Sequence, residues 1–134
     1  MKVTSSLEIR YRDIDSMGHV NNAVYLSYFE QARMAFFNEL IQEKWDWETH
    51  GILVARHEVD YTAPILLIDN AYVDTWCESM GNTSLVFRYE VYKSVNDQRI
   101  TCTLGKTIIV CFDAKAGKTI PVPEEWKSKI QILS

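Results

Sequence analysis

The densest group of chemically active side chains in this sequence lies between residues 13 and 25. Two carboxylates, an imidazole, two amides and a phenol occur in the stretch Asp13-Ile14-Asp15-Ser16-Met17-Gly18-His19-Val20-Asn21-Asn22-Ala23-Val24-Tyr25. A carboxylate can act as a general base or as a nucleophile. The first turn of a helix offers unpaired backbone N–H groups and a positive dipole end, and these stabilise a developing oxyanion. The segment therefore has the parts needed for attack on a carbonyl group, provided that a helix begins within it.

An amphipathic helix is predicted from about residue 22 to residue 42, because apolar side chains recur there at spacings of three and four. The predicted buried positions are Tyr25, Tyr28, Phe29, Ala32, Phe36 and Leu40, and the predicted outer positions are Ser27, Glu30, Gln31, Arg33 and Asn38. Asn21 or Asn22 is a suitable N-cap, since a short amide side chain accepts a hydrogen bond from the first turn. The segment of chemically active residues, 13–25, which we call the chemical segment, would then end at the start of this helix.

The remaining chain reads mainly as strands, because it alternates apolar and polar residues between turn signals. Strands are predicted over 6–13, 52–63, 71–79, 84–94 and 99–112, with a short helical end near 123–130. One helix is too little to cover both faces of about five strands. The sequence therefore predicts an α+β fold with a curled antiparallel sheet wrapped around one long central helix, and a homo-oligomer that covers the remaining apolar face.

Length, charge and cysteine content exclude several classes of protein. The 134 residues suit one domain, 1–134, and show no repeat or low-complexity tract. A net charge of −4 disfavours nucleic acid as a partner, and no apolar run approaches the roughly 20 residues that cross a bilayer. The three cysteines contain no Cys-x-x-Cys pair, which favours buried thiols and a cytoplasmic location.

By pattern, the chemical segment resembles the hydroxybenzoyl-CoA thioesterase family of the hotdog fold. The matching residues are Tyr11-Arg12-Asp13-Ile14-Asp15-Ser16-Met17-Gly18-His19-Val20-Asn21-Asn22, then Tyr25, Phe29, Glu30 and Ala32-Arg33, and further on Asp60-Tyr61, Pro64 and Asp69. The resemblance implies a small acyl-CoA thioesterase that releases free acid and coenzyme A. It also implies a homodimer or a homotetramer built as a dimer of dimers, with active sites at subunit boundaries. No cofactor is implied, because coenzyme A is part of the substrate.

The resemblance also assigns roles within the segment. Asp15 matches the family's catalytic carboxylate, which either attacks the thioester carbonyl or activates a water molecule. The backbone N–H of Asn22 is the expected donor to the thioester oxygen. His19 and Asn21 are expected to orient Asp15 or the attacking water.

Other residues are expected to bind substrate or to stabilise the fold. Tyr25 packs in the core or lines the acyl pocket, and Gly18 is expected at the binding loop. Arg56 is one of several basic strand residues that could meet the phosphates of coenzyme A, and His57 could approach the site from its strand. Asp13 is expected to make a structural salt bridge or turn. No metal site is expected, because Asp13-x-Asp15 has no further carboxylates nearby.

Two other functions remain open at this point. A hotdog enoyl-CoA hydratase or 3-hydroxyacyl-thioester dehydratase typically pairs a histidine with an acid on or near the central helix, whereas Asp15 and His19 both precede the helix interior. A non-catalytic acyl-CoA-binding module would bind without turnover and would have little use for Asp15. The sequence contains no Gly-x-Ser-x-Gly, phosphate loop or dinucleotide fingerprint.

Overall fold

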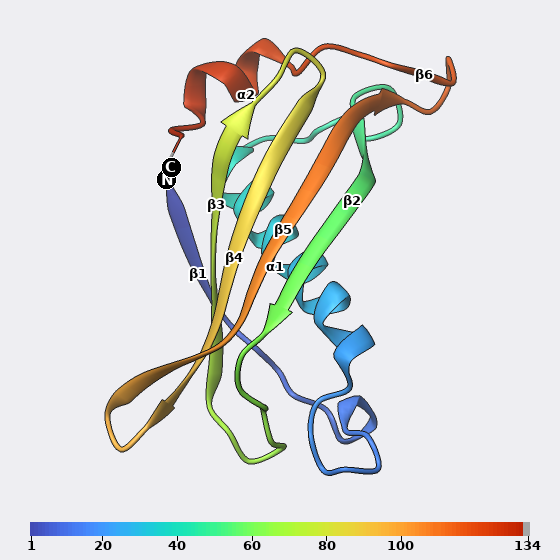
Figure 1. Ribbon diagram of the computed structural model, residues 1–134. Helices are drawn as coiled ribbons and strands as arrows, with labels where there is room; N and C mark the ends of the chain where they lie inside the picture. Colours follow the sequence, from blue (N-terminus) through green and yellow to red (C-terminus); the bar gives the residue numbers. More distant parts are fainter. Residues whose placement is uncertain (133–134) are drawn as a thin grey trace.

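A computed structural model describes residues 1–132 and shows a curled antiparallel sheet with one long helix across its face (Figure 1). The elements are β1 (Lys2–Ser6), two 3₁₀ turns (Tyr11–Asp13 and Asn22–Val24), α1 (Tyr25–Leu40), β2 (Gly51–Tyr61), β3 (Ala71–Met80), β4 (Ser84–Val95), β5 (Gln98–Asp113), β6 (Lys118–Thr119) and α2 (Glu124–Lys129). The strand order is β1-β3-β4-β5-β2, and β6 pairs with β5. The predicted curled sheet and single central helix are therefore confirmed.

The core lies between α1 and the inner face of the sheet. Alternate residues of β4 are fully buried against the helix: Leu85, Phe87, Tyr89 and Val91. The ring of Phe29 stacks on that of Tyr89 with 4.3 Å between ring centroids. A β-carbon at Gly105 would collide with the Phe29 ring, so the missing side chain at Gly105 lets the helix approach the sheet. Each fully buried aromatic side chain stabilises the fold by about 2–3 kcal/mol.

The helix differs from its prediction at one end and at one residue. Its start at residue 22 is confirmed, as a 3₁₀ turn that continues into α1, but it ends at Leu40 and not at 42. The predicted inner and outer positions are confirmed except for Arg33, which is only 5% exposed. Its guanidinium donates to the Tyr89 hydroxyl at 3.0 Å, and this polar contact allows a charged side chain to lie on the buried side.

The first predicted strand, 6–13, is wrong in position. β1 instead spans Lys2–Ser6 and pairs with β3, while Tyr11–Asp13 forms a 3₁₀ turn. The Asp13 carboxylate accepts hydrogen bonds from the Arg10 N–H and from the Tyr28 hydroxyl, both at 2.9 Å. These bonds favour a turn over an extended chain, and they leave Tyr11 84% exposed.

The later elements are confirmed with boundaries shifted by at most two residues. The strand predicted over 52–63 is β2, which ends at Tyr61. The predicted helical end is α2, whereas the short strand β6 was not predicted. All three cysteines are free and buried, as predicted. Within residues 1–132, no helix is long and apolar enough to cross a membrane.

Candidate active site

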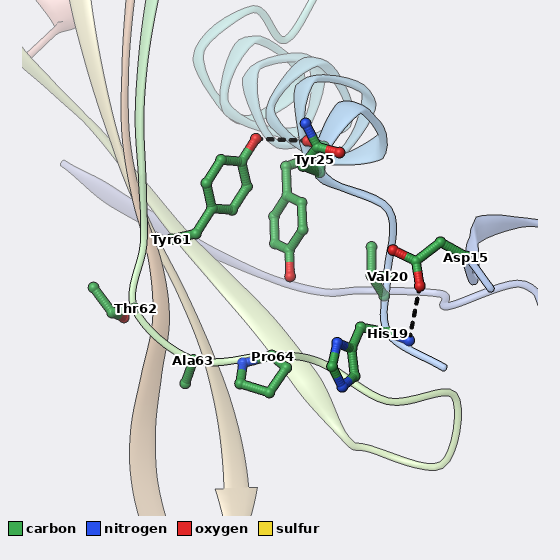
Figure 2. A pocket seen from close by; sticks show the side chains of 9 residues that line it. Asp15, His19, Val20, Tyr25, Tyr61, Thr62, Ala63 and Pro64 are labelled. Carbon is green, nitrogen blue, oxygen red and sulfur yellow. Dashed lines mark hydrogen bonds between the residues drawn. The ribbon is translucent and has the colours of Figure 1, made fainter. Parts of the chain in front are cut away.

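A pocket of about 320 Å³ lies between the loop that precedes α1 and the chain that leaves β2 (Figure 2). Its lining comes from two segments far apart in the sequence: Asp15, His19, Val20, Asn22 and Tyr25 on one side, and Tyr61, Thr62, Ala63 and Pro64 on the other. The fold therefore places four of the predicted site residues at one pocket, namely Asp15, His19, Asn22 and Tyr25.

The Asp15 carboxylate is held by the backbone of its own loop. Its Oδ1 atom accepts hydrogen bonds from the N–H groups of Met17 at 2.9 Å and His19 at 3.3 Å. A β-bridge between Ile14 and Val20 closes the loop, and Gly18 makes the return possible with a φ of +84°. Within residues 1–132 the Oδ2 atom has no hydrogen-bond partner, so it is available for chemistry.

The start of the helix leaves one backbone N–H unused. Asn21 caps the helix, because its side-chain oxygen accepts from the Ala23 N–H at 2.9 Å. The N–H groups of Asn21 and Val24 donate to the carbonyls of Asp13 (2.8 Å) and Asn21 (3.0 Å). The Asn22 N–H has no partner in the part of the chain that the structure describes, and Asn22 lines the pocket.

The loop is tied to the rest of the fold from both sides. The Val20 N–H donates to the Ile65 carbonyl at 2.8 Å, and the Tyr28 hydroxyl of α1 donates to Asp13. Asp13 therefore has the structural turn role that the sequence predicts. These contacts set the position of the Asp15 loop relative to the helix.

The wall from Tyr61 to Pro64 was not predicted as part of the site. The only sequence signals were a strand that ends before Pro64 and the family resemblance of Asp60-Tyr61 and Pro64, and neither places the segment beside Asp15. The Tyr61 hydroxyl donates to the Asn22 carbonyl at 2.6 Å, shown as a dashed line in Figure 2.

Tyr25 lines the pocket beside Tyr61. The two rings meet edge to face with centroids 5.1 Å apart. Tyr25 is only 3% exposed, and burial raises the pKa of its hydroxyl to about 12. Its phenol is therefore neutral at ordinary pH, and Tyr25 both belongs to the core and lines the pocket.

The other predicted site residues lie outside the pocket lining. Gly18 and Asn21 belong to the same loop, whereas Arg56 and His57 lie on β2. Arg56 pairs with Glu58 at 2.8 Å. His57 Nδ1 lies 2.9 Å from the Thr107 hydroxyl, and burial, together with Arg33, lowers its pKa. Roles of Arg56 and His57 in binding stay predictions. Among residues 1–132, no cluster of three or more His, Cys, Asp or Glu side chains could hold a metal ion.

Comparison with known proteins identifies the family. The sequence model of the thioesterase-like superfamily matches residues 9–130. The acyl-CoA thioester hydrolase YbgC of Escherichia coli O6:H1 is 29% identical over 120 residues, which cover 88% of this chain and 87% of YbgC.

Solved structures agree with this match. A thioesterase from Thermus thermophilus, complexed with coenzyme A and Zn, is 36% identical with a TM-score of 0.81, covering 95% of this chain and 90% of that one. A 4-hydroxybenzoyl-CoA thioesterase complexed with 4-hydroxybenzoyl-CoA shares the fold, with a TM-score of 0.87 at 15% identity over 97% and 99% of the two chains.

The chain therefore belongs to the thioesterase-like superfamily, and its curled sheet and central helix are the hotdog fold. It is a thioester hydrolase. The family resemblance of the chain is thereby confirmed.

Proposed function

We propose that this protein hydrolyses acyl-CoA thioesters to a free acid and coenzyme A, with Asp15 as the reacting carboxylate. The observation that carries the proposal is that Asp15 and Asn22 line one pocket, and that among residues 1–132 neither the Asp15 Oδ2 atom nor the Asn22 N–H has a hydrogen-bond partner. One can attack or act as a base, and the other can bind the oxyanion that forms. The names of YbgC and of the Thermus thermophilus structure support this choice of substrate.

The proposed reaction begins when the thioester oxygen accepts a hydrogen bond from the Asn22 N–H. Asp15 then takes a proton from a water molecule that attacks the carbonyl carbon, or it attacks the carbon itself and forms an anhydride that water later cleaves. In the first route the C–S bond of the tetrahedral intermediate breaks, and the proton held by Asp15 passes to the departing thiolate of coenzyme A. In the second route the C–S bond breaks as the anhydride forms and the thiolate takes a proton from solvent, and hydrolysis of the anhydride then releases the free acid and restores the Asp15 carboxylate. A backbone donor of this kind stabilises the transition state by about 3 kcal/mol.

His19 and Asn21 have supporting roles in the proposal. The His19 N–H holds Asp15, and its ring lines the same pocket (Figure 2), where it can orient the attacking water. Asn21 acts through the cap that fixes the first turn. The reaction requires only water and the acyl-CoA, so we propose that no further cofactor takes part.

Substrate contacts follow from the position of the pocket. We propose that the acyl group lies against Tyr25 and that the pantetheine arm passes the loop at Gly18, where no atom lies within 4 Å of the β-carbon position. Arg56 and His57 remain candidates for the coenzyme A end, on β2.

We also propose that two copies form a dimer along β2, alone or within a dimer of dimers. β2 ends the strand order and pairs only with β5 among the described strands. Its Leu53 and Val54 are 51% and 46% exposed, and an open strand edge with apolar side chains is a surface for a second strand. Three free, buried cysteines suit a reducing compartment, and we propose the cytoplasm.

A panel of short, medium, long and aromatic acyl-CoAs tests the proposal, with release of the coenzyme A thiol followed by a thiol reagent. Turnover of at least one class is expected. Absence of turnover above background for every class contradicts hydrolysis. Hydration of crotonyl-CoA, or saturable binding of coenzyme A without turnover, would instead indicate one of the two alternative functions.

A further inference from the structure

The hydrogen bond between Tyr61 and Asn22 links the two walls of the pocket. We propose that Tyr61 is a positioning residue for the oxyanion-binding amide: its hydroxyl fixes the start of the helix so that the Asn22 N–H faces the substrate. This inference rests on the proposed hydrolysis and names a residue that prepares its oxyanion donor.

The peptide group between Asn22 and Ala23 is held at both of its polar atoms. Its carbonyl oxygen accepts from the Tyr61 hydroxyl at 2.6 Å, and its N–H donates to the Asn21 side chain at 2.9 Å. On the other side of Asn22, the Asn21 carbonyl accepts from Val24 at 3.0 Å. A rotation that turned the Asn22 N–H away from the pocket would strain or break these bonds.

Tyr61 is well placed to impose this geometry. It is the last residue of β2 and pairs with Thr103 of β5, so its backbone is fixed by the sheet. Its ring packs against Tyr25, which limits the swing of the hydroxyl (Figure 2). Burial raises the pKa of the Tyr61 phenol, which therefore retains the proton that it donates.

The same geometry gives the Tyr61 hydroxyl a partner other than the groups that react. Its hydroxyl proton is already donated to the Asn22 carbonyl, so the hydroxyl acts on the thioester only through the helix start. Tyr61 as a whole residue is 48% exposed in the single chain, so removal of the hydroxyl alone leaves the core packing intact. A loss of rate without a loss of fold is the expected signature of positioning, since small displacements of a catalytic group lower the rate steeply.

The test compares Tyr61→Phe with Tyr92→Phe in the full chain. The control variant Tyr92→Phe also removes one side-chain hydrogen bond, from the Tyr92 hydroxyl to Asp74 at 3.3 Å. Tyr92, however, lies outside the pocket lining. On the best acyl-CoA of the panel, Tyr61→Phe is expected to lower kcat about tenfold and to change KM less than about twofold. Tyr92→Phe is expected to keep the wild-type kcat.

A second readout does not depend on turnover. Amide hydrogen exchange at Ala23, followed by NMR, is expected to be faster in Tyr61→Phe than in the wild type and unchanged in Tyr92→Phe. The inference is overturned if Tyr61→Phe keeps kcat within twofold, if Tyr92→Phe loses as much, or if exchange at Ala23 does not change. A wild-type protein that turns over no acyl-CoA contradicts the proposed hydrolysis instead, and the exchange measurement then decides the positioning role by itself.

Discussion

Asp15 and His19 hold each other through two hydrogen bonds that run in opposite senses, one between backbone groups and one from the backbone to the carboxylate. The Asp15 N–H donates to the His19 carbonyl at 2.8 Å, and the His19 N–H donates to the Asp15 carboxylate at 3.3 Å. One oxygen of the carboxylate is thereby fixed by the loop while the other is left available. The arrangement explains how a carboxylate on a surface loop can be oriented without a charged partner.

The Asn21 cap should be needed for both stability and rate. Asn21→Ala removes the acceptor of the Ala23 N–H and is expected to lower the free energy of unfolding by about 1 kcal/mol. It should also lower kcat, because the first turn loses its fixed geometry. Urea unfolding and steady-state kinetics measure the two effects. Asn21→Ser keeps a cap acceptor, and an equal loss in that variant would argue against the capping role.

Gly105 should tolerate no side chain while Phe29 is present. Gly105→Ala puts a methyl group where the Phe29 ring lies and is expected to destabilise the protein by about 1–3 kcal/mol. The double variant Gly105→Ala/Phe29→Leu should lose less stability than the sum of the two single variants, since the smaller side chain leaves room. Thermal unfolding of the three variants measures this, and strict additivity would contradict the steric account.

Asp74 should make the free energy of unfolding fall as the pH is lowered. Although burial opposes ionisation, hydrogen bonds from Thr4 at 2.7 Å and Arg99 at 3.0 Å lower the pKa of Asp74 below its ordinary value. A lowered pKa in the folded state means stability that is present above the unfolded value of about 3.9 and lost as the pH falls through the folded value.

Asp74→Asn is therefore expected to cost about 1–3 kcal/mol at pH 7 and less at pH 3. Urea unfolding at both pH values measures the difference. The exposed Glu39→Gln serves as the control and should show little effect at either pH. If Asp74→Asn lowers the free energy of unfolding as much at pH 3 as at pH 7, the carboxylate charge is not responsible for the loss of stability.

The fold was predictable where burial follows a regular spacing. Tyr25, Phe29 and Phe36 recur at helical intervals, and their predicted buried positions are confirmed. Leu85 and Phe87, which alternate along β4, are buried as well. Arg33 could not be placed from its polarity, because its burial depends on the Tyr89 hydroxyl, which comes from a strand 56 residues later.

The candidate site was predictable only on one side. Asp15, His19 and Asn22 are close in sequence, so a short loop and a helix start bring them together. The position of the Tyr61–Pro64 segment depends on how the sheet curls around the helix, and local sequence patterns do not encode that.

The prediction of a strand over 6–13 is wrong for a related reason. The alternation of Leu7 and Ile9 resembles a strand, but hydrogen bonds to Asp13 favour a turn.

The most direct test of the account is the turnover of Asp15→Asn on the best acyl-CoA substrate. Asparagine keeps a side-chain oxygen for the Met17 and His19 N–H groups, so the fold and KM should change little, and the thermal midpoint should stay near that of the wild type. Because the amide can neither attack the carbonyl nor take a proton from water, kcat should fall at least about a hundredfold. A folded Asp15→Asn protein that keeps a third or more of the wild-type kcat would contradict the central role of Asp15.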